Sequence, residues 1–110
     1  MSAECFQIDL ADNVATLLQD APASAVLTVR GDASTPTVRT VEPIRAEHKV
    51  AVADIAAGQP ILKYGFPIGV ATQPIARGQW VHLHNCRSSY DALSSELDIE
   101  SGSRTETPYV

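Results

Sequence analysis

The sequence predicts a mainly β domain of short strands, followed by one short helix near the C-terminus. Three observations lead to this prediction: apolar residues that alternate with a period of two, a turn motif that recurs after twenty residues, and helical spacing of apolar residues after residue 88. We place the β domain at residues 1–87, and the helix with a polar tail at residues 88–110. A chain of 110 residues is long enough for one modest core.

The first half of the chain carries the strand pattern. Phe6, Ile8 and Leu10 recur at every second position, which predicts a half-buried strand with these side chains in the core. Further strands or extended segments are predicted at residues 14–18, 25–29 and 37–44.

A turn motif occurs twice in the second half, at residues 54–61 (DIAAGQPI) and 74–81 (PIARGQWV). In each unit we expect the isoleucine to anchor a tight turn in the core. Gly58 and Gly78 would supply the left-handed backbone conformation that closes the turn, before the chain leaves as a strand. The alternative is chance similarity between two short turn motifs.

The pattern changes from Ser88 onwards. Tyr90, Leu93 and Leu97 are spaced at i, i+3 and i+7, and the serines before them are suited to capping a helix. This predicts one short helix at about residues 88–97.

Charge and hydropathy exclude several classes of function. The net charge of −5 and the absence of a basic cluster argue against nucleic-acid binding. No apolar run approaches the ~20 residues that span a bilayer, and the N-terminus lacks a signal-peptide pattern, so we expect a cytoplasmic protein without membrane contact. Cys5 and Cys86 are interpreted as partly buried thiols, because two distant cysteines make neither a disulfide scaffold nor a CxxC metal site.

The segment His82-Leu83-His84-Asn85 is the strongest chemical signal in the chain. We expect it on an outgoing strand, where His82 and His84 would project from one face. Two such imidazoles could act as metal ligands, or as an acid or base beside a substrate-binding donor. The alternative is a pair of hydrogen-bonded structural histidines.

Two other short segments carry groups that could bind a substrate. His48 and Lys49 precede an alternating segment, so one of them is expected to face a cleft, although a solvated pair is the alternative. Lys63 and Tyr64 precede a Gly/Pro-rich loop, and a lysine there could hold a carboxylate or simply lie on the surface.

Taken together, these motifs resemble a known family. The segment from Lys63-Tyr64-Gly65 to Gly69, with Gly78-Gln-Trp-Val-His82-Leu-His84-Asn85, looks like the SAF domain of altronate and galactarate dehydratases. The resemblance covers about residues 6–86. It implies a β-clip fold, an arrangement of short strands folded over on itself.

The resemblance also implies a site and a partner. It implies seven site residues but not their individual roles: His48, Lys63, Tyr64, Gly65, His82, His84 and Asn85. We expect His82 and His84 to be catalytic residues, and metal ligands shared with a partner. We expect His48, Lys63, Tyr64, Gly65 and Asn85 to bind the substrate. A divalent metal, with iron among the candidates, would be held largely by a larger subunit.

Our first hypothesis is therefore the small subunit of a hydro-lyase that converts a sugar acid or related hydroxy acid to a 2-keto acid. It would act on a small carboxylate substrate together with a large catalytic subunit. Without that subunit it would be inactive. The alternatives are the small subunit of a sulfolactate sulfo-lyase, a non-catalytic module for sugar-acid binding or assembly, and an engineered or natural fragment that simply folds. Such a fragment could form a homo-oligomer by pairing exposed edge strands.

Overall fold

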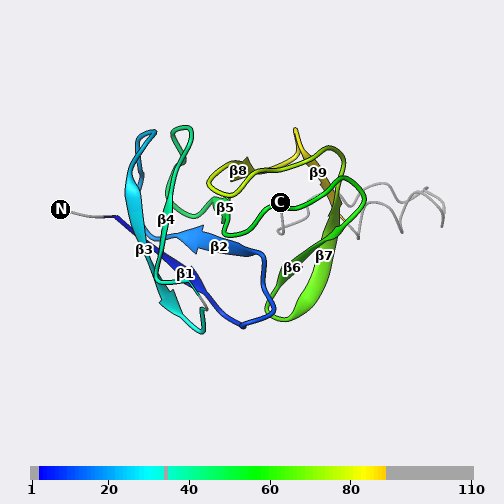
Figure 1. The fold of residues 1–110 in the computed structure, drawn as a ribbon, viewed down its shortest axis with the longest axis horizontal. Coiled ribbons are helices and arrows are strands. Elements are labelled where there is room, and N and C mark those ends of the chain that lie inside the picture. The colour runs from blue at the N-terminus through cyan, green and yellow to red at the C-terminus, as the bar shows by residue number, and fades with distance from the viewer. Residues whose placement is uncertain (1–2, 34, 89–110) are drawn as a thin grey trace, which may run out of the picture.

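The protein folds into strands and tight turns that form two sheets (Figure 1). The structure, a computed structural model, describes residues 3–33 and 35–88. Its strands are β1 Glu4–Gln7, β2 Val14–Leu17, β3 Val26–Gly31, β4 Thr37–Arg39, β5 Lys49–Ala51, β6 Pro60–Lys63, β7 Phe66–Ala71, β8 Trp80–Val81 and β9 Cys86–Ser88. This confirms the predicted mainly β fold.

The predicted helix at residues 88–97 lies outside the described residues, apart from Ser88, which ends β9. Within the described part of the chain, no helix is both long and apolar enough to cross a membrane.

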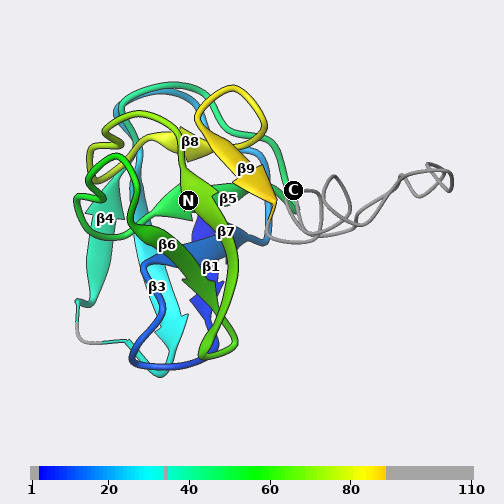
Figure 2. The ribbon, with the colours of Figure 1, turned by 90° about the vertical axis from the view of Figure 1, so that its right-hand side faces the viewer.

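The larger sheet has the strand order β4-β3-β1-β2-β5-β8, and the smaller sheet has the order β6-β7-β9. In the larger sheet β1 pairs parallel with β3, whereas the other strand pairs are antiparallel. Figure 2 shows the smaller sheet standing in front of β1, β2 and β5. The buried apolar residues form two clusters. The second cluster fills the space between the two sheets, because it combines Val14, Ala51 and Val81 with Ile61, Ala71 and Cys86.

Strand β5 is buried on both faces, which makes it the centre of the fold. Val50 packs with Leu17 and Leu27 in the first hydrophobic cluster, and the next residue, Ala51, packs in the second. The other buried members of the first cluster are Cys5, Ala15, Ala21, Val29, Val38, Ile44 and Val52. All three residues of β5 are buried, including Lys49. A strand covered on both sides reads as a continuous buried run rather than as an alternating one.

The predicted face of the first strand is wrong. Phe6, Ile8 and Leu10 are 40%, 39% and 63% exposed, whereas Cys5 and Gln7 point inwards. Gln7 is buried because its side-chain amide donates to two backbone carbonyls of the following turn. The alternation of apolar residues predicts the wrong buried face because a hydrogen-bonded polar side chain, Gln7, occupies a core position.

The repeated turn is confirmed, and its two copies face each other. Ile55 and Ile75 form an antiparallel bridge, and each is 1% exposed. Gly58 and Gly78 have φ angles of 87° and 93°, in the left-handed region that glycine tolerates. In each copy the glutamine after the glycine accepts a hydrogen bond from the backbone N–H three residues before it, at 2.7 Å and 2.6 Å.

The same turn occurs two more times in the described residues, at 21–25 and 44–48. Ala21 bridges Ile44 as Ile55 bridges Ile75, and both anchors are buried. Ser24 and Glu47 hold the positive φ angles in place of glycine, at 63° and 71°. Four similar turns in two facing pairs therefore organise the part of the chain that the structure describes. The residue that follows the positive-φ position is Gln59 or Gln79 in one pair, and His48 in the second turn of the other.

A buried carboxylate holds the β6–β7 turn. Asp12 is 5% exposed, and its two carboxylate oxygens accept hydrogen bonds from the backbone N–H groups of Tyr64 and Gly65, at 3.0 Å and 2.8 Å. One of these oxygens also accepts from the N–H of Asp9, at 3.1 Å. Tyr64 and Gly65 both have positive φ, as a two-residue type I′ hairpin turn requires.

Replacing Asp12 by alanine should lower the free energy of unfolding by about 2 kcal/mol, because three backbone donors lose a charged acceptor. Urea denaturation followed by circular dichroism measures the change. The matched control is Asp54→Ala, which removes one exposed hydrogen bond, to the N–H of Arg77, and should cost well below about 1 kcal/mol. Equal losses in the two variants would show that Asp12 does not secure the turn.

Candidate functional site

All three histidines of the sequence gather round the single tryptophan. The ring centroid of Trp80 lies 5.6 Å from that of His48, 5.1 Å from that of His82 and 4.8 Å from that of His84. His82 stacks on the indole with an interplanar angle of 13°, and its ring lies 5.1 Å from that of His48. We call these four residues the histidine cluster.

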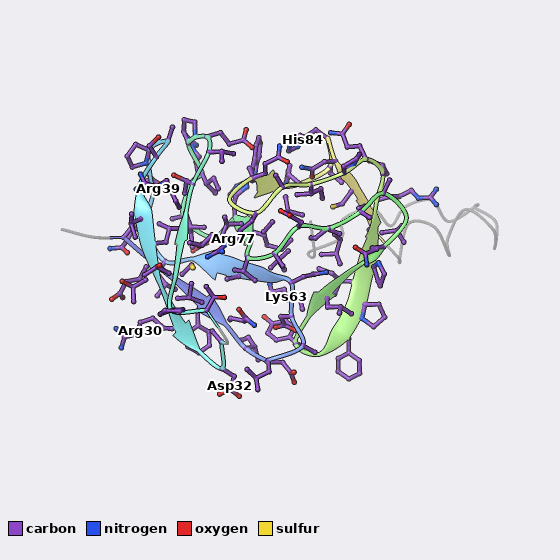
Figure 3. All side chains as sticks on the ribbon, viewed as in Figure 1. Arg30, Asp32, Arg39, Lys63, Arg77 and His84 are labelled. Carbon is purple, nitrogen blue, oxygen red and sulfur yellow. The ribbon has the colours of Figure 1, made fainter. Side chains whose placement is uncertain are left out.

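Sheet pairing brings the histidine cluster together from two distant segments. His48 directly precedes β5, and β5 pairs with β8 through the partners Val50 and Trp80. His82 and His84 follow β8 in the loop to β9, at the top of the molecule, where Figure 3 labels His84. His84 is exposed, whereas His48 and His82 are partly buried.

The expected outgoing strand at His82–His84 is wrong, because β8 ends at Val81 and these residues form a turn. The backbone carbonyl of His82 accepts hydrogen bonds from the N–H groups of Asn85 and Cys86. Asn85, 1% exposed, closes the turn from inside: its side chain accepts from the N–H of His82 at 3.0 Å and donates to the carbonyl of Trp80 at 2.8 Å. The two histidines share a tight turn that a buried amide fixes.

One hydrogen bond links the two segments of the histidine cluster. The indole Nε1–H of Trp80 donates to Nδ1 of His48 over 3.1 Å. Trp80 is itself held, since its backbone N–H donates to the Glu42 carboxylate at 3.0 Å and its carbonyl accepts from Asn85. The indole also packs against the first hydrophobic cluster.

Burial lowers the pKa of His82 below its ordinary value of 6.5, and electrostatic interactions with His48, Lys49 and His84 add to the effect. A lowered pKa keeps this imidazole neutral at pH 7, which is the form that accepts a proton. His82 is therefore suited to act as a base.

Lys49 is near enough to His82 to affect its pKa, and it lies on the same face of β5 as Ala51, which points between the two sheets. It is 5% exposed, and burial lowers its pKa from 10.5 to about 8, with a further contribution from the charge of Lys63. Of the pair His48 and Lys49, His48 is the residue that joins the cluster and Lys49 is the buried one.

Lys63, Tyr64 and Gly65 lie apart from the histidine cluster. The β6–β7 turn is at the bottom of Figures 1 and 2, and the β8–β9 loop is at the top of both. Lys63 packs its amine 4.8 Å from the centre of the Tyr64 ring, and the N–H groups of Tyr64 and Gly65 donate to Asp12. The structure thus brings together His48, His82, His84 and Asn85 of the predicted site, and leaves the Lys63–Gly65 segment at the opposite end.

The histidine cluster does not by itself make a metal centre. Within residues 3–33 and 35–88, no group of three or more His, Cys, Asp or Glu side chains is placed to hold an ion. His48 already uses Nδ1 as an acceptor for the indole. A metal would therefore need ligands from another polypeptide.

Sequence reasoning missed the place of Trp80 in this region, and it did not decide which of His48 and Lys49 faces inwards. Trp80 stood in the repeated turn motif, where the first copy has Pro60, and that departure was the available signal. The sequence could not show that Lys49 is the buried one, because a lysine next to a histidine is common on surfaces and its burial depends on β5 being covered on both sides.

Residues 3–89 match the family model described as the altronate/galactarate dehydratase SAF domain. The match includes the whole histidine cluster and both pairs of turns. The chain belongs to this SAF domain family. This confirms the resemblance that the Lys63–Gly69 and Gly78–Asn85 segments indicated.

Two of the SAF domain's relatives are altronate dehydratases. The enzyme of Escherichia coli K12 is 40% identical over 87 residues, which are 79% of this chain and 17% of that one. The enzyme of Bacillus subtilis 168 is 35% identical over 78 residues, which are 71% of this chain and 15% of that one. The SAF chain therefore spans less than a fifth of the dehydratases that it matches.

A third relative is named as a subunit. The (2R)-sulfolactate sulfo-lyase subunit alpha of Chromohalobacter salexigens is 39% identical over 41 residues, which are 37% of this chain and 44% of that one. Because so short a match makes up 44% of it, that subunit is a small polypeptide.

Both cysteines are free and buried, in agreement with their interpretation as thiols. Burial raises the pKa of Cys5 to about 12, which makes it a poor nucleophile. Burial also raises the pKa of Cys86.

Proposed function

We propose that this SAF domain is the small component of a hydro-lyase that converts a sugar acid or related hydroxy acid to a 2-keto acid in the cytoplasm. A larger polypeptide would supply the rest of the active site, because the matched domain is only 17% of the E. coli altronate dehydratase. The observation that carries the proposal is the convergence of His48, His82 and His84 round Trp80 in a member of this family.

The reaction needs a base, an acid and a group that holds the substrate. Loss of water from a hydroxy acid requires removal of the proton next to the carboxylate, and protonation of the leaving hydroxyl. His82, neutral at pH 7, is suited to the first task, and the exposed His84 to the second. His48 would contribute a hydrogen bond to the carboxylate, which gains charge as the proton leaves.

The family's implied divalent metal would be bound mainly by the larger polypeptide. With the ligands it needs, it would stabilise the negative charge that develops on the substrate carboxylate. His82 and His84 could add at most two ligands from this chain.

The roles of the other predicted residues follow from their positions. Asn85 would support the site by fixing the His82–His84 turn, because its side chain is fully hydrogen-bonded within the domain. Substrate binding by Lys63, Tyr64 and Gly65 stays a prediction, and it would require the substrate or a second ligand to reach the opposite end of the small sheet.

A sulfo-lyase is the second candidate. It is favoured by the short sulfolactate sulfo-lyase subunit alpha among the relatives. The two reactions share proton removal next to a carboxylate and differ in the leaving group, which is sulfite instead of water.

The proposal is tested by co-expressing the full chain with a candidate large subunit. Aldonic, aldaric and sulfonated hydroxy acids are then assayed for release of a 2-keto acid. We expect activity from the mixture and from neither component alone, and the active substrate decides between a hydro-lyase and a sulfo-lyase. Full activity of the large subunit without this chain would contradict the proposal.

A further inference from the structure

Trp80 stands at the centre of the histidine cluster, although none of the sequence motifs gives it a function. It contacts all three imidazoles, and it is the only tryptophan in the chain. An indole offers one polar atom, a hydrogen-bond donor that cannot accept. Any neighbouring atom that forms a hydrogen bond with the indole N–H must therefore act as the acceptor.

The neighbour is Nδ1 of His48, which accepts the indole N–H at 3.1 Å. A ring nitrogen that accepts a hydrogen bond carries no proton, so the neutral His48 ring must hold its proton on Nε2. Nε2 is also the nitrogen left for a ligand. His48 can thus give a ligand a hydrogen-bond donor, but not an acceptor, while this contact persists.

The indole is held firmly enough to impose this choice. The backbone of Trp80 is tied on both sides, by the Glu42 carboxylate and the Asn85 amide. Its ring is fixed by the first hydrophobic cluster and by His82, stacked at 13°. A donor with this support costs little further ordering when a ligand arrives.

We infer that Trp80 is a positioning residue that fixes His48 as a hydrogen-bond donor, through Nε2, towards a carboxylate or enediolate oxygen of the substrate. This rests on the proposed function in one respect only, namely that His48 meets the substrate. The two histidines then have different roles in the histidine cluster: His48 donates a hydrogen bond, and His82 remains free to take a proton.

The contact itself is tested on the full chain by NMR, without a partner or an assay. In the uniformly ¹⁵N-labelled protein, an N–H···N hydrogen bond gives a scalar coupling between the indole nitrogen and Nδ1 of His48, and the ¹⁵N shifts identify the tautomer. We expect the coupling to be present and the proton to be on Nε2. Absence of the coupling, or a proton on Nδ1, would overturn the inference.

The matched variant removes the donor and keeps the ring. Because Trp80 is the only tryptophan, growth of a tryptophan auxotroph on 3-benzothienylalanine replaces it with an isostere that lacks the N–H. We expect the His48 ring to lose its single orientation and to populate both tautomers, while the fold is retained. Trp80→Phe serves as a second variant, and an unchanged tautomer in both would overturn the positioning role.

The consequence for the substrate is tested in the assembled enzyme by two replacements of His48. Glutamine places an amide donor near the position of Nε2, whereas asparagine places one near that of Nδ1. We expect His48→Asn to raise KM about tenfold, the cost of one lost hydrogen bond, and His48→Gln to restore most of it. Equal KM values for the two variants would refute donation through Nε2. Failure of the proposed function would instead appear as no activity in the wild-type mixture, with the NMR result unchanged.

Discussion

Replacing His82 by glutamine is expected to lower kcat of the assembled lyase about 100-fold or more, because the reaction loses its base. Glutamine is similar in size and hydrogen-bonding capacity but cannot take up a proton at neutral pH. The substitution should leave KM nearly unchanged, since the interaction it removes acts in the transition state. Steady-state kinetics with the preferred hydroxy acid measure both constants, and urea denaturation checks that the variant is folded.

The pH dependence of the wild-type enzyme gives an independent readout of the same residue. The pKa of His82 is lowered, chiefly by burial and further by His48, Lys49 and His84. The neutral ring of His82 is the active form of the base, so protonation of this ring should lower kcat/KM as the pH drops through a pKa below 6.5. His82→Gln should remove this acid limb from the residual activity. A variant with wild-type turnover and an unchanged limb would exclude His82 as the base.

Replacing Gly78 by alanine should lower the free energy of unfolding by at least about 3 kcal/mol, because a left-handed backbone and a steric clash occur together. Gly78 has a φ of 93°, and a Cβ at this position would lie 2.2 Å from the backbone carbonyl oxygen of Arg39. The clash is with backbone, so a side-chain rotation cannot relieve it. Denaturant unfolding measures the loss.

Gly58 provides a matched control within the same fold. It occupies the equivalent position of the facing turn, with a φ of 87°, but a Cβ there would meet nothing within 4 Å. Gly58→Ala should therefore cost only the left-handed conformation, about 1 kcal/mol. If both substitutions cost the same, the close approach of the fourth turn to β4 does not contribute to stability. The difference matters for the site, because Gly78 lies two residues before Trp80.

Only two of the four similar turns in the described residues could be predicted from the sequence. The copies at Gly58 and Gly78 could be predicted because glycine marks a left-handed position in the sequence. The copies at Ser24 and Glu47 adopt the same conformation with residues that usually avoid it, so the sequence carries no mark there. Their positions depend on the Ala21–Ile44 bridge, a contact between segments far apart in the chain.

The candidate site was predictable in its residues but not in its geometry. The three histidines were identifiable as candidates from their neighbours and spacing in the sequence. The sequence could not show that their rings lie together, because His48 comes close to His82 only through the pairing of β5 with β8. The turn that carries His82 and His84 depends on the buried amide of Asn85, a tertiary feature without a periodic signature.

We expect the His82–His84 turn to face the larger subunit in the assembled lyase. Leu83, at the tip of this turn, is 58% exposed, and Phe66, which begins β7 beside the β6–β7 turn at the opposite end, is 68% exposed. Each is replaced in turn by the photoreactive residue p-benzoylphenylalanine, and the active complex is irradiated. We predict efficient cross-linking to the large subunit from position 83 and little from position 66. An active complex that cross-links from position 66 and not from position 83 would contradict this arrangement.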